Sequence, residues 1–459
     1  MLDEHCKLKI PENVRYLIDI LKEDGYEAYI VGGCVRDSLL YKQPNDWDIC
    51  TSAKPQEVID LLECYDDIEV ILTGLKHGTI TAHVNGKNYE ITTYRIDGEY
   101  SDNRRPDSVI FVDDIEKDLS RRDFTINAMA YDGGSFLDIT RIVDPYRGWE
   151  DLHEGIIRCV GNPDERFQED GLRILRALRF ASTYGFKIEA DTAAAIHRNK
   201  KLLNNISAER IQSELCKMLC GKGVLDILLN YKDIMAVIIP ELEPCIGFKQ
   251  NNPYHIYDVY THIAHAVANY MGPDVSIKMG LLLHDIGKPE CYSEDENGGH
   301  FYGHSVPSMR IAKDVMDRLK FDNKTKQEVA DLVLYHDADI YPGRRSVKRW
   351  LNKIGYEMLD KLINIKGADN GAHSEMAQIS RPWRFLEVRN IAGDIMNEQQ
   401  CFQIKDLAIN GNDLINIGFN EGPGIGKVLN HLLEKVIDEE IENEYEALME
   451  EIDRYLKGE

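Results

Sequence analysis

Hydrophobic and polar residues repeat with two different periods in the first third of the chain. Some segments place apolar residues every three to four positions, which predicts helices, whereas others alternate with a period of two, which predicts strands. Two alternating runs meet at Asn85-Gly86, a strong β-hairpin signal. The predicted elements are helices over residues 13–26 and 56–65, strands over 27–33 and 46–51, and a hairpin over 78–95.

From Glu150 onward the helical period dominates, apart from one short strand-like run at 155–160. Glycine and proline clusters are candidate breaks between helices, and no repeat of fixed period is present. These patterns predict a small α/β head followed by a long all-helical body. The predicted division is a head at 1–150, a neck at 151–212, a body at 213–375 and a tail at 376–459.

Composition narrows the class of protein. The 459 residues carry 79 acidic and 54 basic side chains, a net charge of −25, which excludes a uniformly basic nucleic-acid-binding protein but not an enzyme with local basic patches. No apolar run approaches a membrane span, the N-terminal residues do not predict a signal peptide, and the ten cysteines form no CxxC pair. We expect a cytoplasmic protein with reduced cysteines. The basic clusters lie at 176–180, 197–201, 341–350 and 380–385.

Two carboxylates one residue apart, Asp46 and Asp48, stand in the sequence NDWDIC. In a strand these side chains share a face, and their repulsion favours a cation between them. Mg²⁺ is the natural partner, because it is held by one or two carboxylates together with substrate phosphates. The alternative is a solvated edge strand whose acids are there by chance.

Gly32, Gly33 and Arg36 precede the aspartates, between a predicted strand and a helical pattern. Glycines at such a turn let backbone N–H groups approach a phosphate, and Arg36 can reach a phosphate oxygen. Glu90 would add a third carboxylate if its strand lies beside the aspartates; otherwise it is a surface glutamate. Two metal ions held by carboxylates would activate a hydroxyl and neutralise leaving pyrophosphate, so the predicted reaction is nucleotidyl transfer.

GGCVRDSLL followed by DWDICTSA resembles the head of the class II tRNA nucleotidyltransferases, which add CCA to tRNA 3′ ends and include bacterial poly(A) polymerases. DLSRRDFTINAMAYD, EDGLRILRALRF and SAERIQSEL agree with that family in the same order, and the C-terminal LAINGNDLINIGFNEGPGIGKVLNHLLEKVI is also similar. The resemblance covers nearly the whole chain. It implies a DNA polymerase β-like palm as the head, with an all-α neck, body and tail.

The resemblance also implies roles for particular residues. Base reading has independent support from residue chemistry, because an aspartate accepts from the exocyclic amine that C and A share and an arginine donates to a ring nitrogen or carbonyl. Asp170, Arg173 and Arg176 recur at i, i+3 and i+6, as on one helix surface, although ordinary ion pairs from Asp170 to either arginine are the alternative. The implied roles are magnesium binding for Asp46 and Asp48, triphosphate contact for Gly33 and Arg36, sugar and phosphate contact for Arg122 and Asn127, and base reading for Asp170 and Arg173 with Arg176 and Arg179 nearby.

A second set of candidate ligands occurs in the helical body, in the order H…HD…H…H…D, which resembles the HD phosphohydrolase superfamily. Imidazoles and carboxylates suit manganese, nickel, iron or magnesium. A phosphohydrolase acting on 2′,3′-cyclic or 3′-phosphate ends would fit the trimming of damaged tRNA, but a metal bound without turnover and a vestigial site are alternatives. The set is His262, His284, Asp285, His304, His336 and Asp369.

The main functional hypothesis is a CTP- and ATP-dependent tRNA nucleotidyltransferase that binds the tRNA acceptor arm. The polar run DGEYSDNRRPD resembles the flexible loop of members that add the full CCA. The alternatives are a poly(A) polymerase or a CC- or A-adding relative, an HD phosphohydrolase with a degenerate head, and a non-catalytic nucleotide-sensing RNA-binding protein.

Overall fold

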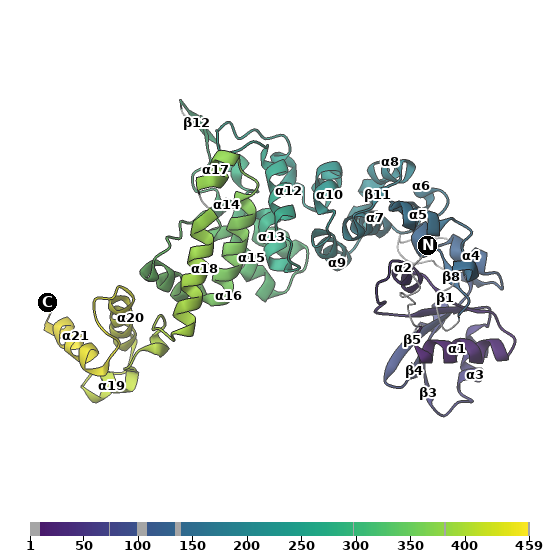
Figure 1. Cartoon of the computed structure of the whole chain (residues 1–459), viewed down its shortest axis with the longest axis horizontal. Helices are drawn as coiled ribbons and strands as arrows, with labels where there is room; N and C mark the ends of the chain where they lie inside the picture. Colours follow the sequence, from purple (N-terminus) through teal and green to yellow (C-terminus); the bar gives the residue numbers. More distant parts are fainter. Residues whose placement is uncertain are drawn as a thin grey trace. The chain divides into compact units, whose positions relative to one another are not determined.

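The computed structural model describes residues 10–72, 74–98, 108–133, 139–296, 298–380 and 382–457, in two compact units, Met1–Pro240 and Glu241–Glu459 (Figure 1). Most of the run DGEYSDNRRPD lies outside the described residues. No helix in the described ranges combines the length and apolarity that a membrane span requires. The four-part division at residues 150, 212 and 375 stays a prediction.

A seven-stranded mixed sheet forms the centre of the head, with the order β3-β4-β5-β2-β1-β8-β9. β2 pairs in parallel with β5 and antiparallel with β1. The strands are β1 (Ala28–Val31), β2 (Asp48–Thr51), β3 (Ile68–Ile71), β4 (Thr79–Val84), β5 (Lys87–Thr93), β8 (Ala130–Tyr131) and β9 (Ile142–Val143), with the two-stranded pairs β6 (Arg95–Asp97) with β7 (Val109–Phe111) and β10 (Ile156–Ile157) with β11 (Lys187–Ile188) outside this sheet.

The predicted hairpin is confirmed as β4–β5, joined by Asn85 and Gly86, whose φ angles of 51° and 76° suit a tight hairpin turn. Ile49, Ile80 and Ile91 are fully buried on one face of the sheet. Because side chains alternate between faces, this buried set directs Asp48 and Glu90 to the opposite face.

Helices pack against the sheet and make up most of the rest of the first unit. The predicted helix over residues 13–26 is α1 (Glu12–Glu23), whose apolar stripe is buried. The other helical segments of the first unit are α2 (Gly33–Leu39), α3 (Pro55–Leu62), η1 (Leu75–His77), α4 (Ile115–Ser120), η2 (Thr125–Asn127), η3 (Ile139–Arg141), α5 (Gly148–Glu154), α6 (Pro163–Glu169), α7 (Leu172–Tyr184), α8 (Ala190–Asn199), η4 (Lys200–Asn205), α9 (Ala208–Leu219), α10 (Val224–Asn230) and α11 (Lys232–Ile238).

The continuous helical pattern predicted through EDGLRILRALRF is wrong at one point, because the chain breaks between α6 and α7. Asp170 adopts an extended conformation (φ −140°, ψ 105°), and its Oδ1 accepts the Leu172 amide at 3.0 Å. At Gly171, a Cβ would lie 3.0 Å from the Leu202 side chain, so close packing requires glycine there. Asp170 therefore precedes the helix that carries Arg173 and Arg176.

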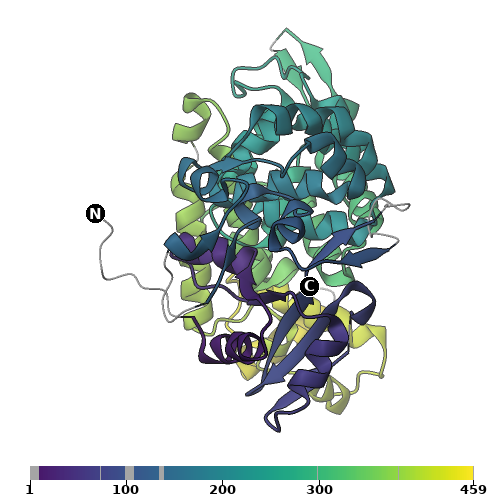
Figure 2. The same ribbon diagram turned by 90° about the vertical axis from the view of Figure 1, so that its right-hand side faces the viewer.

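The second unit is mostly helical, with a short hairpin of β12 (Ser293–Asp295) and β13 (Gly298–His300) that projects from the helices (Figures 1 and 2). Gly355, with φ 77°, kinks its longest helix, α16 (Arg344–Asn370). The remaining segments are η5 (Pro240–Cys245), α12 (Val259–Asn269), α13 (Val275–Leu283), η6 (Lys288–Cys291), α14 (Ser305–Arg318), α15 (Asn323–Tyr335), α17 (Glu375–Ser380), α18 (Pro382–Asn397), η7 (Ile404–Asp406), α19 (Gly411–Asn416), α20 (Pro423–Ile437) and α21 (Tyr445–Lys457).

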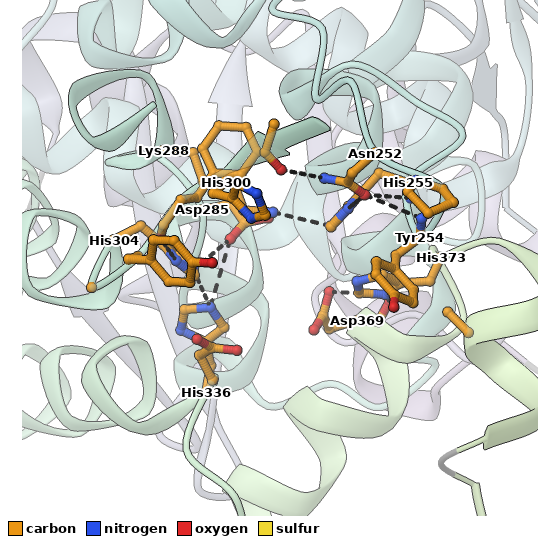
Figure 3. A pocket seen from close by; sticks show the side chains of 17 residues that line it. Asn252, Tyr254, His255, Asp285, Lys288, His300, His304, His336, Asp369 and His373 are labelled. Carbon is orange, nitrogen blue, oxygen red and sulfur yellow. Dashed lines mark hydrogen bonds and ion pairs between the residues drawn. The ribbon is translucent and has the colours of Figure 1, made fainter. Parts of the chain in front are cut away.

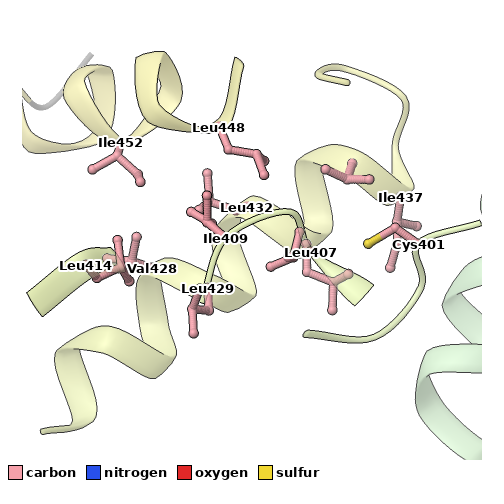
Figure 4. Packing of buried hydrophobic residues seen from close by; sticks show 12 residues of the cluster. Cys401, Leu407, Ile409, Leu414, Val428, Leu429, Leu432, Ile437, Leu448 and Ile452 are labelled. Carbon is pink, nitrogen blue, oxygen red and sulfur yellow. The ribbon is translucent and has the colours of Figure 1, made fainter. Parts of the chain in front are cut away.

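The C-terminal segment after α18 has its own apolar core, in which Leu414, Leu432 and Leu448 from three different helices are completely buried (Figure 4). The acidic end of the chain supplies part of this core through Ile452 on α21. The acidic helices are therefore amphipathic, with solvated charges on one side and a packed face on the other.

Candidate functional site

The three predicted head carboxylates lie at one end of β2 and on its neighbour β5. Asp48 begins β2 and stands directly opposite Glu90 in the parallel pair with β5, as a site with three carboxylates requires. Trp47 and Ile49 are buried, whereas Asp46, Asp48 and Glu90 are exposed. Asp46 precedes the strand instead of lying within it, but the alternation still directs it to the same side as Asp48.

The electrostatics of this group suit a cation. The atoms packed around the Asp48 carboxyl raise its pKa, and the nearby charges of Glu90 and Asp46 raise it further, against the opposing effect of Arg122. A divalent ion would relieve the repulsion among the carboxylates, and oxygen ligands are the ones that magnesium prefers. Among the described residues, every group of three or more possible metal-ligand atoms that lie within 4.8 Å of one another is in the second unit. The head carboxylates are therefore further apart than the members of those groups.

Two arginines lie beside the predicted phosphate-binding glycines. Gly32 has φ 82°, and a Cβ there would lie 2.9 Å from Arg122 Nη1; a Cβ at Gly33 would lie 3.4 Å from Arg36 Nη2. Arg122 Nη2 is held at 3.3 Å by Asp118 Oδ2, a buried carboxylate. The two glycines therefore let two guanidinium groups pack directly against the backbone of the turn, an arrangement suited to a polyphosphate.

A chain of hydrogen bonds joins the phosphate side of the head to α7. Arg36 Nη1 donates to Asn127 Oδ1 at 2.5 Å, and Asn127 Nδ2 donates to Asp123 Oδ1 at 3.0 Å. Arg176 on α7 completes the chain with its Nε donating to Asp123 Oδ2 at 2.8 Å. The sequence predicted Arg36, Asn127 and Arg176 as separate contacts and missed Asp123, which connects them although it lies within the RRDFTINA motif.

Asp123 is expected to make the free energy of unfolding depend on pH in the acidic range. Burial alone raises its pKa, but Arg176 and the Asn127 amide outweigh burial and hold the pKa at about 2. The pKa of Asp123 in the folded state is below that of an unfolded aspartate. The stabilisation that its ionised carboxylate gives the fold is therefore complete above about pH 4 and is lost as the pH falls toward 2. Relative to Asp123→Asn, the wild type should therefore lose about 2 kcal/mol of unfolding free energy between pH 6 and pH 2 in urea titrations.

The matched control is Asp66→Asn, which changes an exposed carboxylate of the same unit. Its unfolding free energy should follow the wild type over the whole pH range. If the unfolding free energies of Asp123→Asn and the wild type change equally with pH, the low pKa of Asp123 is contradicted.

The predicted base-reading residues hold partners other than those expected. Asp170 Oδ2 accepts from Arg210 Nη2 on α9 at 2.7 Å. Arg173 pairs with Glu169 and donates to the Arg121 carbonyl at 3.0 Å. The ion pairs considered from the sequence, Asp170 with Arg173 or Arg176, are not among these contacts. Arg179, predicted nearby, pairs with Glu214.

The second candidate set comes together in the second unit, as the H…HD…H…H…D order predicts. In Figure 3, Asp285 lies beside His304 and His336, and Asp369 lies beside His373. Asp285 Oδ1 is 3.1 Å from His304 Nε2 and 3.6 Å from His336 Nε2. Its Oδ2 is 3.4 Å from His262 Nε2 and 3.2 Å from His284 Nε2. One buried carboxylate thus lies between two pairs of imidazoles.

The orientation of these four imidazoles is fixed by their outer nitrogens. Nδ1 of His284, His304 and His336 lies 2.6–2.8 Å from the carbonyl of the residue three positions earlier in the chain, and His262 Nδ1 lies 3.3 Å from the Ala372 carbonyl. These bonds place the proton on Nδ1 and leave the lone pair on Nε2. Metal-binding histidines are held in this way by hydrogen bonds from the second ring nitrogen.

The inner nitrogens then face each other in two close pairs. His304 Nε2 is 3.1 Å from His336 Nε2, and His262 Nε2 is 3.4 Å from His284 Nε2. Burial lowers the pKa of His284, but Asp285 and Asp369 outweigh burial and raise it to about 10, so a proton can take the place of a cation. Asp285 Oδ2 is buried among cationic and imidazole nitrogens, with Lys288 Nζ at 2.7 Å. The donor set therefore fits metal ions.

The end of helix α13 brings two neighbouring ligand candidates to one centre. α13 ends at Leu283, so that His284 and Asp285 occupy the following turn and both reach the same centre. The sequence missed His255 and His373, which line the adjoining cavity of about 590 Å³ and form a further donor group with His262. No spacing pattern distinguishes these two histidines, because long-range packing brings them together.

Comparison with known proteins identifies the family. Residues 28–158 match "Poly A polymerase head domain", residues 185–246 match "RNA and SrmB- binding site of polymerase A", and residues 307–452 match "tRNA nucleotidyltransferase domain 2". The CCA-adding enzyme of Geobacillus stearothermophilus is 34% identical over 438 residues, 94% of each chain. That of Lactobacillus delbrueckii subsp. bulgaricus is 33% identical over 434 residues, 95% of each chain. The chain belongs to the family of CCA-adding enzymes.

Solved structures of CCA-adding enzymes support the fold. The Bacillus stearothermophilus enzyme in complex with CTP matches with a TM-score of 0.71 and 29% identity, covering 98% of this chain and 100% of that one. The Thermotoga maritima CCA-adding enzyme complexed with tRNA_CCA matches with a TM-score of 0.60 over 97% of each chain, but at 21% identity it shows the fold alone. The predicted polymerase β-like head with a helical remainder is confirmed, as is the nucleotidyltransferase class, whose members use divalent metal ions.

Proposed function

We propose that this chain adds CCA to the 3′ end of tRNA, taking CTP and ATP without a nucleic-acid template and releasing pyrophosphate. The observation that carries the proposal is the alignment of Asp48 with Glu90 in the sheet, beside Gly32 and Gly33 with Arg36 and Arg122. Carboxylates for a metal ion and guanidinium groups for a triphosphate are thereby placed in one compact unit. A cytoplasmic location and the acceptor arm as the bound part of tRNA remain predictions.

Asp46 and Asp48 would hold magnesium, with Glu90 as a third carboxylate. When bound, the metal supplies charge neutralisation at the phosphates and activates the primer hydroxyl for attack on the α-phosphate. The guanidinium groups of Arg36 and Arg122 would bind the triphosphate oxygens. Asn127, which is oriented by Asp123, would contact the sugar and phosphates.

Base selection would come from Asp170 and Arg173, since C and A share the amine and ring acceptor pattern that G and U lack. In the nucleotide-free chain these two side chains pair with Arg210 and Glu169. An incoming base must therefore exchange these pairs for its own hydrogen bonds. This exchange favours a base that satisfies both groups, because leaving either partly buried charge unpaired is costly. Arg176 and Arg179 would support the site through their pairs with Asp123 and Glu214.

The decisive experiment supplies tRNA that lacks its terminal CCA. CTP alone should add two residues, ATP alone none, and the two together three, each with pyrophosphate release. Continued addition from ATP alone would instead identify a poly(A) polymerase, and a product that stops at CC or requires a CC end would identify a partial enzyme. No pyrophosphate release under any condition would overturn the proposal.

We propose a second function for the helical unit, a metal-dependent phosphohydrolase of the HD type that acts on 2′,3′-cyclic or 3′-phosphate ends. The observation that favours it is the position of Asp285 between two imidazole pairs, which suits two ions: His262, His284 and Asp369 would hold one, His304 and His336 would hold the other, and Asp285 would be a ligand of both. The mixed imidazole and carboxylate ligands suit manganese, iron or nickel as well as magnesium. Two neighbouring divalent ions would polarise a phosphoryl group and activate water.

Residues of the adjoining cavity would serve this second reaction. Lys288 Nζ lies 2.7 Å from Asp285 Oδ2, 2.9 Å from Gln250 Oε1 and 3.2 Å from His255 Nε2. Its ammonium group therefore holds these three side chains in position beside the cavity. A cavity of about 590 Å³ has room for a nucleotide-sized ligand.

A further inference from the structure

We propose that Phe180 is a positioning residue that fixes Arg36 for the incoming triphosphate and thereby links phosphate binding to the base-reading helix α7. The inference rests on the proposed nucleotidyl transfer, because Arg36 is assigned to the phosphates there. Phe180 itself would touch no substrate. Its effect would pass through the guanidinium group of Arg36.

Arg36 lies against two aromatic rings of α7. Its Cζ is 5.0 Å from the centroid of Phe180 and 5.2 Å from that of Tyr184. The two rings are nearly parallel, with an interplanar angle of 10° and centroids 6.1 Å apart. Both rings and Arg36 are buried, so water competes little with these cation–π contacts.

Phe180 also faces two arginines of its own helix. The Arg179 Cζ is 3.9 Å and the Arg176 Cζ 5.5 Å from its centroid, so three guanidinium groups surround one ring. Each cation has its own carboxylate: Asp37 for Arg36, Asp123 for Arg176 and Glu214 for Arg179. The ring keeps the cations apart and presents a negative face to them, which a smaller aliphatic residue does not do.

Arg36 contacts all of these partners at once. Its Nη1 donates to Asn127, its Nε donates to Asp37 at 2.9 Å, and its Cζ lies close to both rings. Tyr184 reinforces this position, because its hydroxyl donates to Asp37 Oδ1 at 2.9 Å. α7 also carries Arg173, so a shift of this helix during base reading would move the rings on which Arg36 rests.

The test measures phosphate binding apart from base recognition. Tripolyphosphate carries the charges of the nucleotide without its base, so its inhibition constant against nucleotide addition reports on the phosphate site. Phe180→Leu should raise this constant, and the KM for CTP and ATP alike, roughly five- to tenfold, as the loss of a desolvated cation–π contact implies. Affinity for tRNA should stay unchanged.

Phe167→Leu is the matched control. Phe167 is fully buried on α6, and no ring or cation–π contact recorded for the described residues involves it. The control should lower Tm about as much as Phe180→Leu while leaving the tripolyphosphate constant within about twofold of wild type. Equal increases in that constant for both leucine variants would overturn the proposal.

A second pair of variants covers the case in which Phe180→Leu does not fold. Tyr184→Phe keeps the ring and loses only the hydroxyl that donates to Asp37, whereas Tyr184→Leu loses both. Tyr184→Leu should therefore weaken tripolyphosphate inhibition about threefold or more beyond any effect of Tyr184→Phe. Identical constants for this pair would overturn the role of the rings. If the wild type adds no nucleotide, the proposed function fails, but calorimetric binding of tripolyphosphate to the same variants still decides the positioning role.

Discussion

Asp48→Ala and Asp46→Ala are each expected to reduce nucleotide addition by about a thousandfold or more while leaving tRNA binding largely intact. Several kilocalories per mole of transition-state stabilisation depend on the metal that these carboxylates would hold, and each 1.36 kcal/mol corresponds to a factor of about ten in rate. The measurement is single-turnover CCA addition at saturating tRNA, paired with a filter-binding or gel-shift titration of tRNA.

Glu69→Ala is the control, because Glu69 is an exposed carboxylate on the edge strand β3 of the same sheet. Its rate should equal that of the wild type, which separates loss of the metal site from a general loss of negative charge. Addition within tenfold of wild type by Asp48→Ala would contradict the metal assignment. Parallel loss of tRNA affinity would instead indicate a folding defect.

The part of this site that follows from local pattern was predictable from the sequence. Strand alternation places Asp46 and Asp48 on the side opposite the buried Trp47 and Ile49, and Asn85-Gly86 fixes the hairpin that carries Glu90. The pairing of Asp48 with Glu90 needed one further assumption, that β5 lies beside β2, and the structure confirms it. Period-two patterns are informative here because one face of the sheet is buried.

Long-range contacts were not predictable in the same way. The helical period runs through Asp170 without interruption, whereas in the structure Asp170 is extended and its carboxylate accepts the Leu172 amide. Likewise Arg210, 40 positions away in sequence, competes with the predicted partners of Asp170. An ion pair depends on which helices pack together, and a single sequence carries little information about such packing.

The helical unit illustrates the same contrast. The order of histidines and aspartates predicted which six residues meet, because it resembles a known family. It did not predict two opposed imidazole pairs with Asp285 between them, since that depends on the rotation of each helix end. The distances from the two Asp285 oxygens to four imidazoles are what turn a single predicted metal site into a proposed pair of ions.

The second large effect is expected in this unit, where the wild type should bind two divalent ions per chain and Asp285→Ala should lose both. Asp285 is the only proposed ligand shared by the two positions, so its removal opens both coordination shells. His262→Ala and His304→Ala should each lose one ion, because their Nε2 atoms lie near different Asp285 oxygens. Metal content after purification in excess manganese and desalting is measured by plasma mass spectrometry, and hydrolysis of a 2′,3′-cyclic nucleotide is assayed in parallel.

His265→Ala provides the control, since His265 lies on α12 with His262 but stacks on Tyr257, with ring centroids 4.2 Å apart, and belongs to none of the groups of possible metal ligands among the described residues. It should retain two ions. Stoichiometric metal in the wild type without hydrolysis would support a structural centre and contradict the phosphohydrolase. Metal-free wild type would contradict the proposed metal centre as a whole.

Nucleotide addition by Asp285→Ala should equal that of the wild type, because the head carboxylates that would hold magnesium lie in the other compact unit. Only loss of hydrolysis and of both ions, with CCA addition retained, establishes two separate metal-dependent reactions in one chain.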